Sequence, residues 1–105
     1  MVIILSDIEE MKNHQQQFIT LKVKSFSILR EIIGKEQITL LLPRKDEITT
    51  TTVADLRARI LELYPAISAQ RIAMAIAVNA KIANDKSIIN DLDEIALLPP
   101  ISGGG

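Results

Sequence analysis

The chain has 105 residues and a net charge of −1, with 12 basic and 13 acidic residues spread along it, so we expect one domain with a modest core. This charge distribution and an aromatic content of 3% supply neither the basic patch nor the stacking rings that nucleic-acid binding needs. The absence of cysteine excludes disulfides, thiolate metal sites and cysteine nucleophiles, and the single histidine, His14, does not make a metal site alone.

We expect no targeting signal in the N-terminal segment. The apolar stretch at residues 2–5 is too short for the core of a signal peptide, and acidic residues follow it at once. No apolar run approaches the length of a membrane-spanning helix, so we expect a cytoplasmic protein that binds no membrane. We interpret residues 1–17 as an N-terminal extension, either a loose tail or a short helix, and assign it no function. Met11 is an alternative start.

A strand and a short helix are expected first. Apolar and polar residues alternate over residues 18–24, which is the period of a strand with one buried face. Residues 27–33 then predict a short helix, with Ser27 as its N-cap and Gly34 as the residue that ends it.

The strongest helix signal follows a second strand, expected at about residues 37–42 and closed by Pro43, and a polar loop at residues 44–50. Thr52 and Asp55 have the spacing of a capping box, which satisfies free amides at a helix start. Four apolar residues at helical spacing are expected to face the core: Val53, Leu56, Ile60 and Leu63. The proline at position 65 ends the helix at Tyr64.

Three further strands are expected at residues 74–78, 81–83 and 94–98, with turns at Asn79-Ala80 and Asn84-Asp85 between them. This order of elements suits an α+β roll in which a mixed sheet packs on one main helix. We therefore expect one domain over residues 18–98 and an extended tail over residues 99–105.

The tail is the most informative part of the chain. Pro99 and Pro100 fix φ near −65° and form a stiff stem. Gly103, Gly104 and Gly105 follow, and residues without side chains can enter a channel that excludes any other residue. Ordering each of them costs roughly 1–2 kcal/mol, which indicates that another protein binds the tail and uses its terminal carboxylate.

Residues 93–104, which end in Pro99-Pro100-Ile101-Ser102-Gly103-Gly104, resemble the terminal signature of the molybdopterin synthase small subunit family. These sulfur carriers have a ubiquitin-like β-grasp fold and end in a paired proline, two residues and a diglycine. Residues 26–34, 52–56 and 77–79 resemble further pieces of the family, and the resemblance covers about residues 19–104.

The resemblance implies a carrier that is not itself a catalyst and binds no cofactor. An adenylyltransferase uses ATP to activate the terminal glycine, and a sulfurtransferase persulfide then supplies the sulfur of a thiocarboxylate. The large synthase subunit, which is expected to hold the catalytic residues, uses this thiocarboxylate to place sulfur on cyclic pyranopterin monophosphate. The implied assembly is a heterotetramer with two large subunits at its centre.

Three departures from the family stand out. The family normally stops after two glycines, so the reactive carboxylate lies on Gly104 after trimming or on Gly105 without it. The family often has an Asp-Gly turn before the last strand, where this chain has Asp91-Leu92, so the turn must differ or be strained. The last strand ends in aliphatic Leu97 and Leu98 where aromatic residues are frequent.

Partner contacts are predicted at Leu97, Leu98 and Ile101, although one of the two adjacent leucines is expected to fill the core. Arg30 is a further candidate, with an internal salt bridge or a solvated side chain as the alternative. Phe18, Phe26 and Tyr64 are interpreted as core or core-edge residues.

Two other functions fit the same residues. One is a sulfur carrier for thiamin thiazole or tRNA thiolation, or a ubiquitin-like protein modifier. The other is a β-grasp interaction module whose tail is inert, which would keep its function if residues 103–105 were removed.

Overall fold

The computed structural model describes residues 18–44 and 50–100. The predicted N-terminal extension, the greater part of the polar loop, and Ile101, Ser102, Gly103, Gly104 and Gly105 lie outside the described residues. In chain order the elements are β1 (Phe18–Ser25), α2 (Ser27–Ile33), β2 (Gln37–Pro43), α3 (Val53–Leu63), α4 (Ala66–Ala69), β3 (Ala75–Val78), β4 (Lys81–Ile82) and β5 (Glu94–Leu98).

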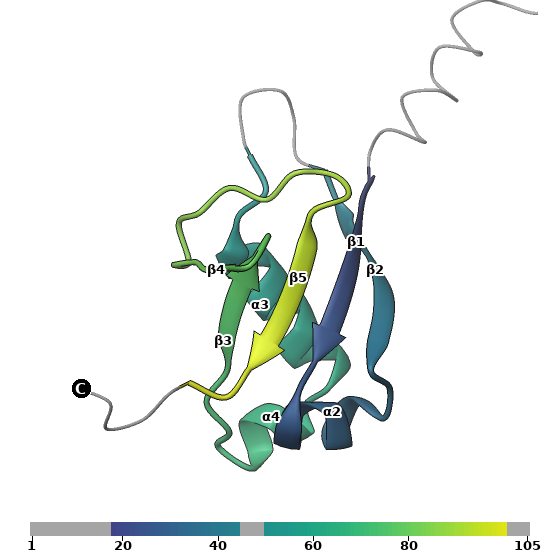
Figure 1. Cartoon of the computed structure of the whole chain (residues 1–105), viewed down its shortest axis with the longest axis vertical. Coiled ribbons are helices and arrows are strands. Elements are labelled where there is room, and N and C mark those ends of the chain that lie inside the picture. The colour runs from purple at the N-terminus through teal and green to yellow at the C-terminus, as the bar shows by residue number, and fades with distance from the viewer. Residues whose placement is uncertain (1–17, 45–49, 101–105) are drawn as a thin grey trace, which may run out of the picture.

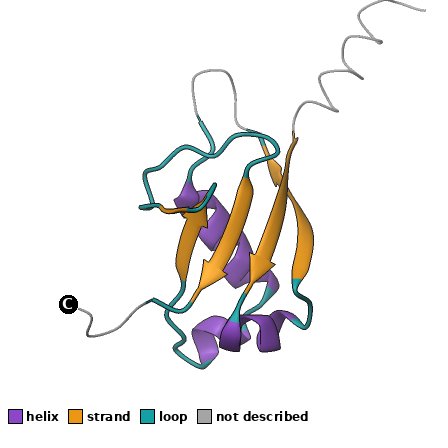
Figure 2. Cartoon of the chain, in the orientation of Figure 1, coloured by secondary structure: helices purple, strands orange, loops and turns teal. Residues whose placement is uncertain are grey.

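The strands form one five-stranded sheet in the order β2-β1-β5-β3-β4 (Figure 1). The first and last strands, β1 and β5, pair in parallel at its centre, whereas β1 with β2, β3 with β5 and β3 with β4 pair antiparallel. The helix α3 crosses behind the sheet, and α2 and α4 lie at the end where β5 finishes (Figure 2). The predicted α+β fold, a mixed sheet on one main helix, is confirmed.

The core lies between the sheet and α3. Burial alternates along β1 and β5 because successive side chains point to opposite faces of a strand. The fully buried aliphatic side chains come from all parts of the fold: Leu21, Val23, Leu29, Val53, Leu56, Ile60, Ile67, Ile76 and Leu97. Each such side chain stabilises the folded chain by roughly 1.5–3 kcal/mol before conformational entropy is subtracted.

The start of α3 is tied to the loop that precedes β5. The predicted capping box is confirmed: the Thr52 side chain accepts from the Asp55 amide, and the Asp55 carboxylate accepts from the Thr52 amide. The next two free amides, those of Val53 and Ala54, donate to the carbonyls of Ser87 at 2.9 Å and Asp85 at 3.0 Å. The amides that a helix start leaves without helical partners are thereby satisfied.

Two details of the helices differ from the sequence prediction. Leu63, predicted to face the core, is 40% exposed, because the adjacent Tyr64 packs against the core in the last turn instead. The predicted end at Tyr64 is confirmed, but the short helix α4, which begins after Pro65 and buries Ile67, was not predicted.

The start of α2 also differs. Phe26, not Ser27, is the N-cap, and its side chain makes no capping hydrogen bond. The Phe26 amide donates to the Leu97 carbonyl at 3.2 Å, and its own carbonyl accepts from the Leu29 amide at 3.1 Å. Pairing with β5 therefore fixes where this helix starts. Gly34 ends the helix as predicted, with φ of 84° and its amide bonded to the Arg30 carbonyl.

No helix in the described ranges is long and apolar enough to cross a membrane.

Candidate functional site

The C-terminal end of β5 places the tail. This strand is hydrogen-bonded on both sides, to β1 and to β3, so its position is fixed along its whole length (Figure 1). Its last residue, Leu98, pairs with Ala75 of β3. Pro99 and Pro100 follow directly and are exposed to solvent. A rigid central strand thus leads straight into the stiff stem predicted from the sequence, and the five residues after it lie outside the described part.

The two adjacent leucines of β5 point to opposite faces. Leu97 is fully buried in the core beside α3, and Leu98 lies half-buried on the outer face of the sheet. Leu97 is therefore the leucine that fills the core, and the partner contact predicted for it is corrected because its side chain has no exposed surface. Leu98 remains available for contact with another protein.

The outer face around Leu98 is apolar. We call this surface the exit patch and define it by four residues: Phe26, Ala75, Ala96 and Leu98. Ala75 pairs with Leu98, and residues that pair across strands share a face. Phe26 follows Lys22 and Lys24 at the two-residue spacing of a strand, so its side chain lies on the same outer face. Its amide donates to the Leu97 carbonyl. The stem leaves the sheet at the edge of this patch.

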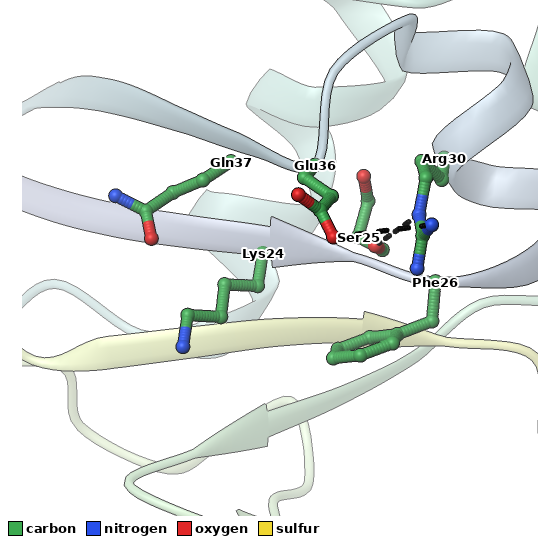
Figure 3. A pocket seen from close by; sticks show the side chains of 6 residues that line it. All are labelled: Lys24, Ser25, Phe26, Arg30, Glu36 and Gln37. Carbon is green, nitrogen blue, oxygen red and sulfur yellow. Dashed lines mark hydrogen bonds and ion pairs between the residues drawn. The ribbon is translucent and has the colours of Figure 1, made fainter.

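A cavity of about 280 Å³ opens next to the exit patch. Figure 3 shows its lining residues, which come from the end of β1, from α2 and from the start of β2: Lys24, Ser25, Phe26, Arg30, Glu36 and Gln37. The predicted contact residue Arg30 lies here, with its Nε donating to the Ser25 carbonyl at 3.4 Å. The structure thus brings Arg30 to the end of the sheet from which the tail leaves.

Two residues of this region escaped the sequence prediction. Phe26 was interpreted as core or core edge, yet it is 38% exposed and forms a wall of the cavity. Lys24 received no role, although it lines the same cavity. The alternation along β1 could have placed both residues. Every second residue of a strand lies on the same face, so Lys24 and Phe26 lie on the outer face together with Lys22.

The chemistry that this region offers is recognition by apolar contact, charge and an exposed chain end. Within residues 18–44 and 50–100, no group of three or more His, Asp or Glu side chains is placed to hold a metal ion.

The chain is similar to known proteins over most of its length. Residues 23–104 match the ThiS family. A molybdopterin synthase sulfur carrier subunit of Dictyostelium discoideum is 38% identical over 85 residues, which cover 79% of this chain and 94% of that protein.

Two solved structures share the fold. One is a complex of subunits 1 and 2 of the molybdopterin-converting factor of Helicobacter pylori, in which a chain matches at 26% identity and a TM-score of 0.52, covering 82% of this chain and 100% of that one. The other is the small archaeal modifier protein 1 of Methanosarcina acetivorans, at 25% identity and a TM-score of 0.62, covering 83% and 98%. The match to the family model covers most of the sequence, and the chain therefore belongs to the ThiS family.

Proposed function

We propose that this chain is the sulfur carrier subunit of a molybdopterin synthase and that it carries sulfur on its C-terminal glycine. The observation that carries the proposal is the sequence Pro-Pro-Ile-Ser-Gly-Gly at residues 99–104, placed directly after the central strand of a ThiS-family fold. The 38% identity to the Dictyostelium discoideum sulfur carrier subunit supports the same reading.

The proposed chemistry begins with an unreactive carboxylate. The carboxylate oxygen of the terminal glycine attacks the α-phosphorus of ATP on an adenylyltransferase, and pyrophosphate leaves. The terminal sulfur of a sulfurtransferase persulfide then attacks the acyl-adenylate and displaces AMP, which leaves an acyl disulfide between the two proteins. A second thiol cleaves its S–S bond by thiol–disulfide exchange, so that the thiocarboxylate leaves and a disulfide forms with the sulfurtransferase. The chain itself supplies only the carbon that is activated, and the catalytic groups belong to the enzymes that bind the tail.

The second stage takes place on the large subunit, where the thiocarboxylate delivers its sulfur to cyclic pyranopterin monophosphate. A dithiolene needs two sulfur atoms, so two charged carriers are used for each product. We propose that the exit patch contacts the large subunit while the stem directs the glycines into its active site. Pro99 and Pro100 lower the entropy lost on insertion, because their φ angles are fixed before binding. The complex of subunits 1 and 2 from Helicobacter pylori supports a large-subunit partner.

A second function is favoured by one observation, the likeness to the Methanosarcina acetivorans modifier protein. In that case the activated glycine would be joined to an amino group of another protein instead of accepting sulfur. Both functions need the same tail and the same activation, so only the product distinguishes them.

The test measures the intact mass of the chain after incubation with ATP, the adenylyltransferase and a persulfide source. We expect one oxygen to be replaced by sulfur, on a C-terminal peptide that identifies Gly104 or Gly105 as the carrier. A chain that lacks residues 103–105 is the matched control and should keep its mass. An adduct to lysine would indicate the modifier function. An unchanged mass with an adenylyltransferase that is active on its own carrier would refute both.

A further inference from the structure

The cavity beside the exit patch holds more hydrogen-bond donors than acceptors on its side chains. Lys24 and Arg30 are cationic, and Gln37 adds an amide group, whereas Glu36 is the single carboxylate among the lining residues. A lysine ammonium and an arginine guanidinium donate only, so both lining cations can bind a carboxylate that enters the cavity.

Arg30 is held in place but its charge is not neutralised at close range. Its Nε donates to the Ser25 carbonyl, and the Ser25 hydroxyl donates to the Lys35 carbonyl at 2.8 Å, which anchors this part of the wall. The Nη1 atom lies 4.0 Å from the Glu36 carboxylate, beyond hydrogen-bond distance, and the Glu36 side chain is 81% exposed. An ion pair of this kind contributes little and is easily exchanged for a better one.

Lys24 lines the cavity and is also a neighbour of the exit patch. It pairs with Gln37 of β2 on one side and with Ala96 of β5 on the other, so the three side chains share the outer face. Among residues 18–44 and 50–100, no carboxylate lies within ion-pair distance of Lys24. A protein that covers Ala96 and Leu98 therefore also covers this unpaired ammonium group.

We propose that this cavity receives an acidic side chain of the large subunit, whose carboxylate replaces Glu36 beside Arg30 and draws the Lys24 ammonium toward it, while the flanking apolar surface of that subunit covers Phe26. The proposal rests on the proposed function, and it adds the chemistry by which the partner is recognised. A cavity of about 280 Å³ is large enough to admit one carboxylate side chain.

A protein carboxylate fits this place better than a free anion does. The cavity is continuous with the exit patch, and Phe26 belongs to both, so an occupant delivered by a protein gains apolar contact as well as charge pairing. The charge pair lies at the surface, and we expect it to speed association and to select the partner more than to add affinity.

The experiment measures binding of the full chain to the large subunit at about 50 mM and about 200 mM salt, since the Debye length shortens over this range. We expect Lys24→Ala and Arg30→Ala each to weaken binding about threefold to tenfold at the lower salt concentration, and less at the higher. Lys22→Ala is the matched control, because Lys22 lies on the same strand and face but does not line the cavity. It should stay within about twofold of the parent chain.

The outcomes separate the two proposals. If the parent chain binds and Lys24→Ala behaves like Lys22→Ala at both salt concentrations, the cavity inference is overturned and the sulfur-carrier proposal stands. If the parent chain does not bind the large subunit, both are overturned. Inorganic phosphate that shifts the Gln37 and Phe26 amide resonances, with no effect of Lys24→Ala on subunit binding, would assign the cavity to a small anion and overturn the inference. Arg30→Lys keeps the charge and tests whether loss of the Ser25 contact alone weakens binding.

Discussion

Leu92 adopts a backbone conformation that leucine avoids, and this leads to a sharp prediction. Its φ is 67°, in the left-handed region, and its side chain is 71% exposed. The turn is held by two hydrogen bonds to β1: the Leu92 amide donates to the Thr20 carbonyl at 2.8 Å, and the Asp91 carboxylate accepts from the Thr20 amide at 2.6 Å. Neither bond uses the Leu92 side chain, so Leu92→Gly should keep both.

The expected magnitude follows from two opposing effects. The left-handed region costs a residue with a β-carbon roughly 1–2 kcal/mol, and glycine removes this cost. Glycine also gives the unfolded chain more freedom, which lowers stability by about 0.4–1 kcal/mol. At the midpoints of these two ranges, Leu92→Gly is expected to raise the free energy of unfolding by about 0.8 kcal/mol. For a domain of this size, 1 kcal/mol corresponds to a rise in melting temperature of about 4–8 °C.

Urea unfolding followed by circular dichroism measures the effect, with the midpoint compared at an unchanged m-value. Leu92→Ala is the control, because alanine loses the exposed side chain but keeps the β-carbon that causes the strain. We expect Leu92→Ala to stay within about 0.5 kcal/mol of the parent chain. If the glycine variant is no more stable than the alanine variant, the reasoning about strain at this turn is wrong.

Two further predictions separate folding from binding. Thr52→Ala removes the hydroxyl that accepts from the Asp55 amide at 3.4 Å, and it should lower the free energy of unfolding in urea by about 1 kcal/mol. The control is Thr50→Ala, at an exposed position before the helix, which should change this free energy by less than about 0.5 kcal/mol. Leu97→Ala should lower stability by about 2–5 kcal/mol because its side chain is fully buried. Leu98→Ala should cost less stability and weaken binding to the large subunit more; the opposite order in calorimetric binding would contradict the assignment of the two faces.

The parts of the fold that were predicted correctly depend on local signals. Alternation along β1 and the capping box at Thr52 are each contained in a few consecutive residues. The start of α2 does not depend on a local signal, because the Phe26 amide donates to the carbonyl of Leu97, which lies far away in the sequence. The prediction of Ser27 as the N-cap rested only on the preference of serine for that position. Leu63 also fits the helical spacing, but the adjacent Tyr64 packs against the core in its place, and the spacing alone does not distinguish the two.

The candidate site was predicted in part for similar reasons. Sequence alone showed that one of Leu97 and Leu98 must be buried, but the choice depends on which face of β5 meets α3. In the parallel pairing of β1 with β5, Leu97 lies opposite Ser25, which is also buried. This pairing decides that Leu97, not Leu98, faces the core. Likewise, Lys24 and Gln37 meet only through the register of β1 with β2. No local pattern indicates that these two and Arg30 line one cavity.

The single strand β5 links stability to the proposed chemistry. Its inner residues, Ile95 and Leu97, are core residues, and its outer residues, Ala96 and Leu98, belong to the surface next to the stem. The core residues and the exit-patch residues of β5 alternate along the same strand. The stem that follows this strand therefore cannot shift relative to the exit patch without disrupting the core. A partner that binds the patch therefore meets Pro99 at a fixed place. Hydrogen bonds to β1 and β3 hold the strand that leads into Pro99, so the direction in which the stem leaves the sheet is set by the fold itself.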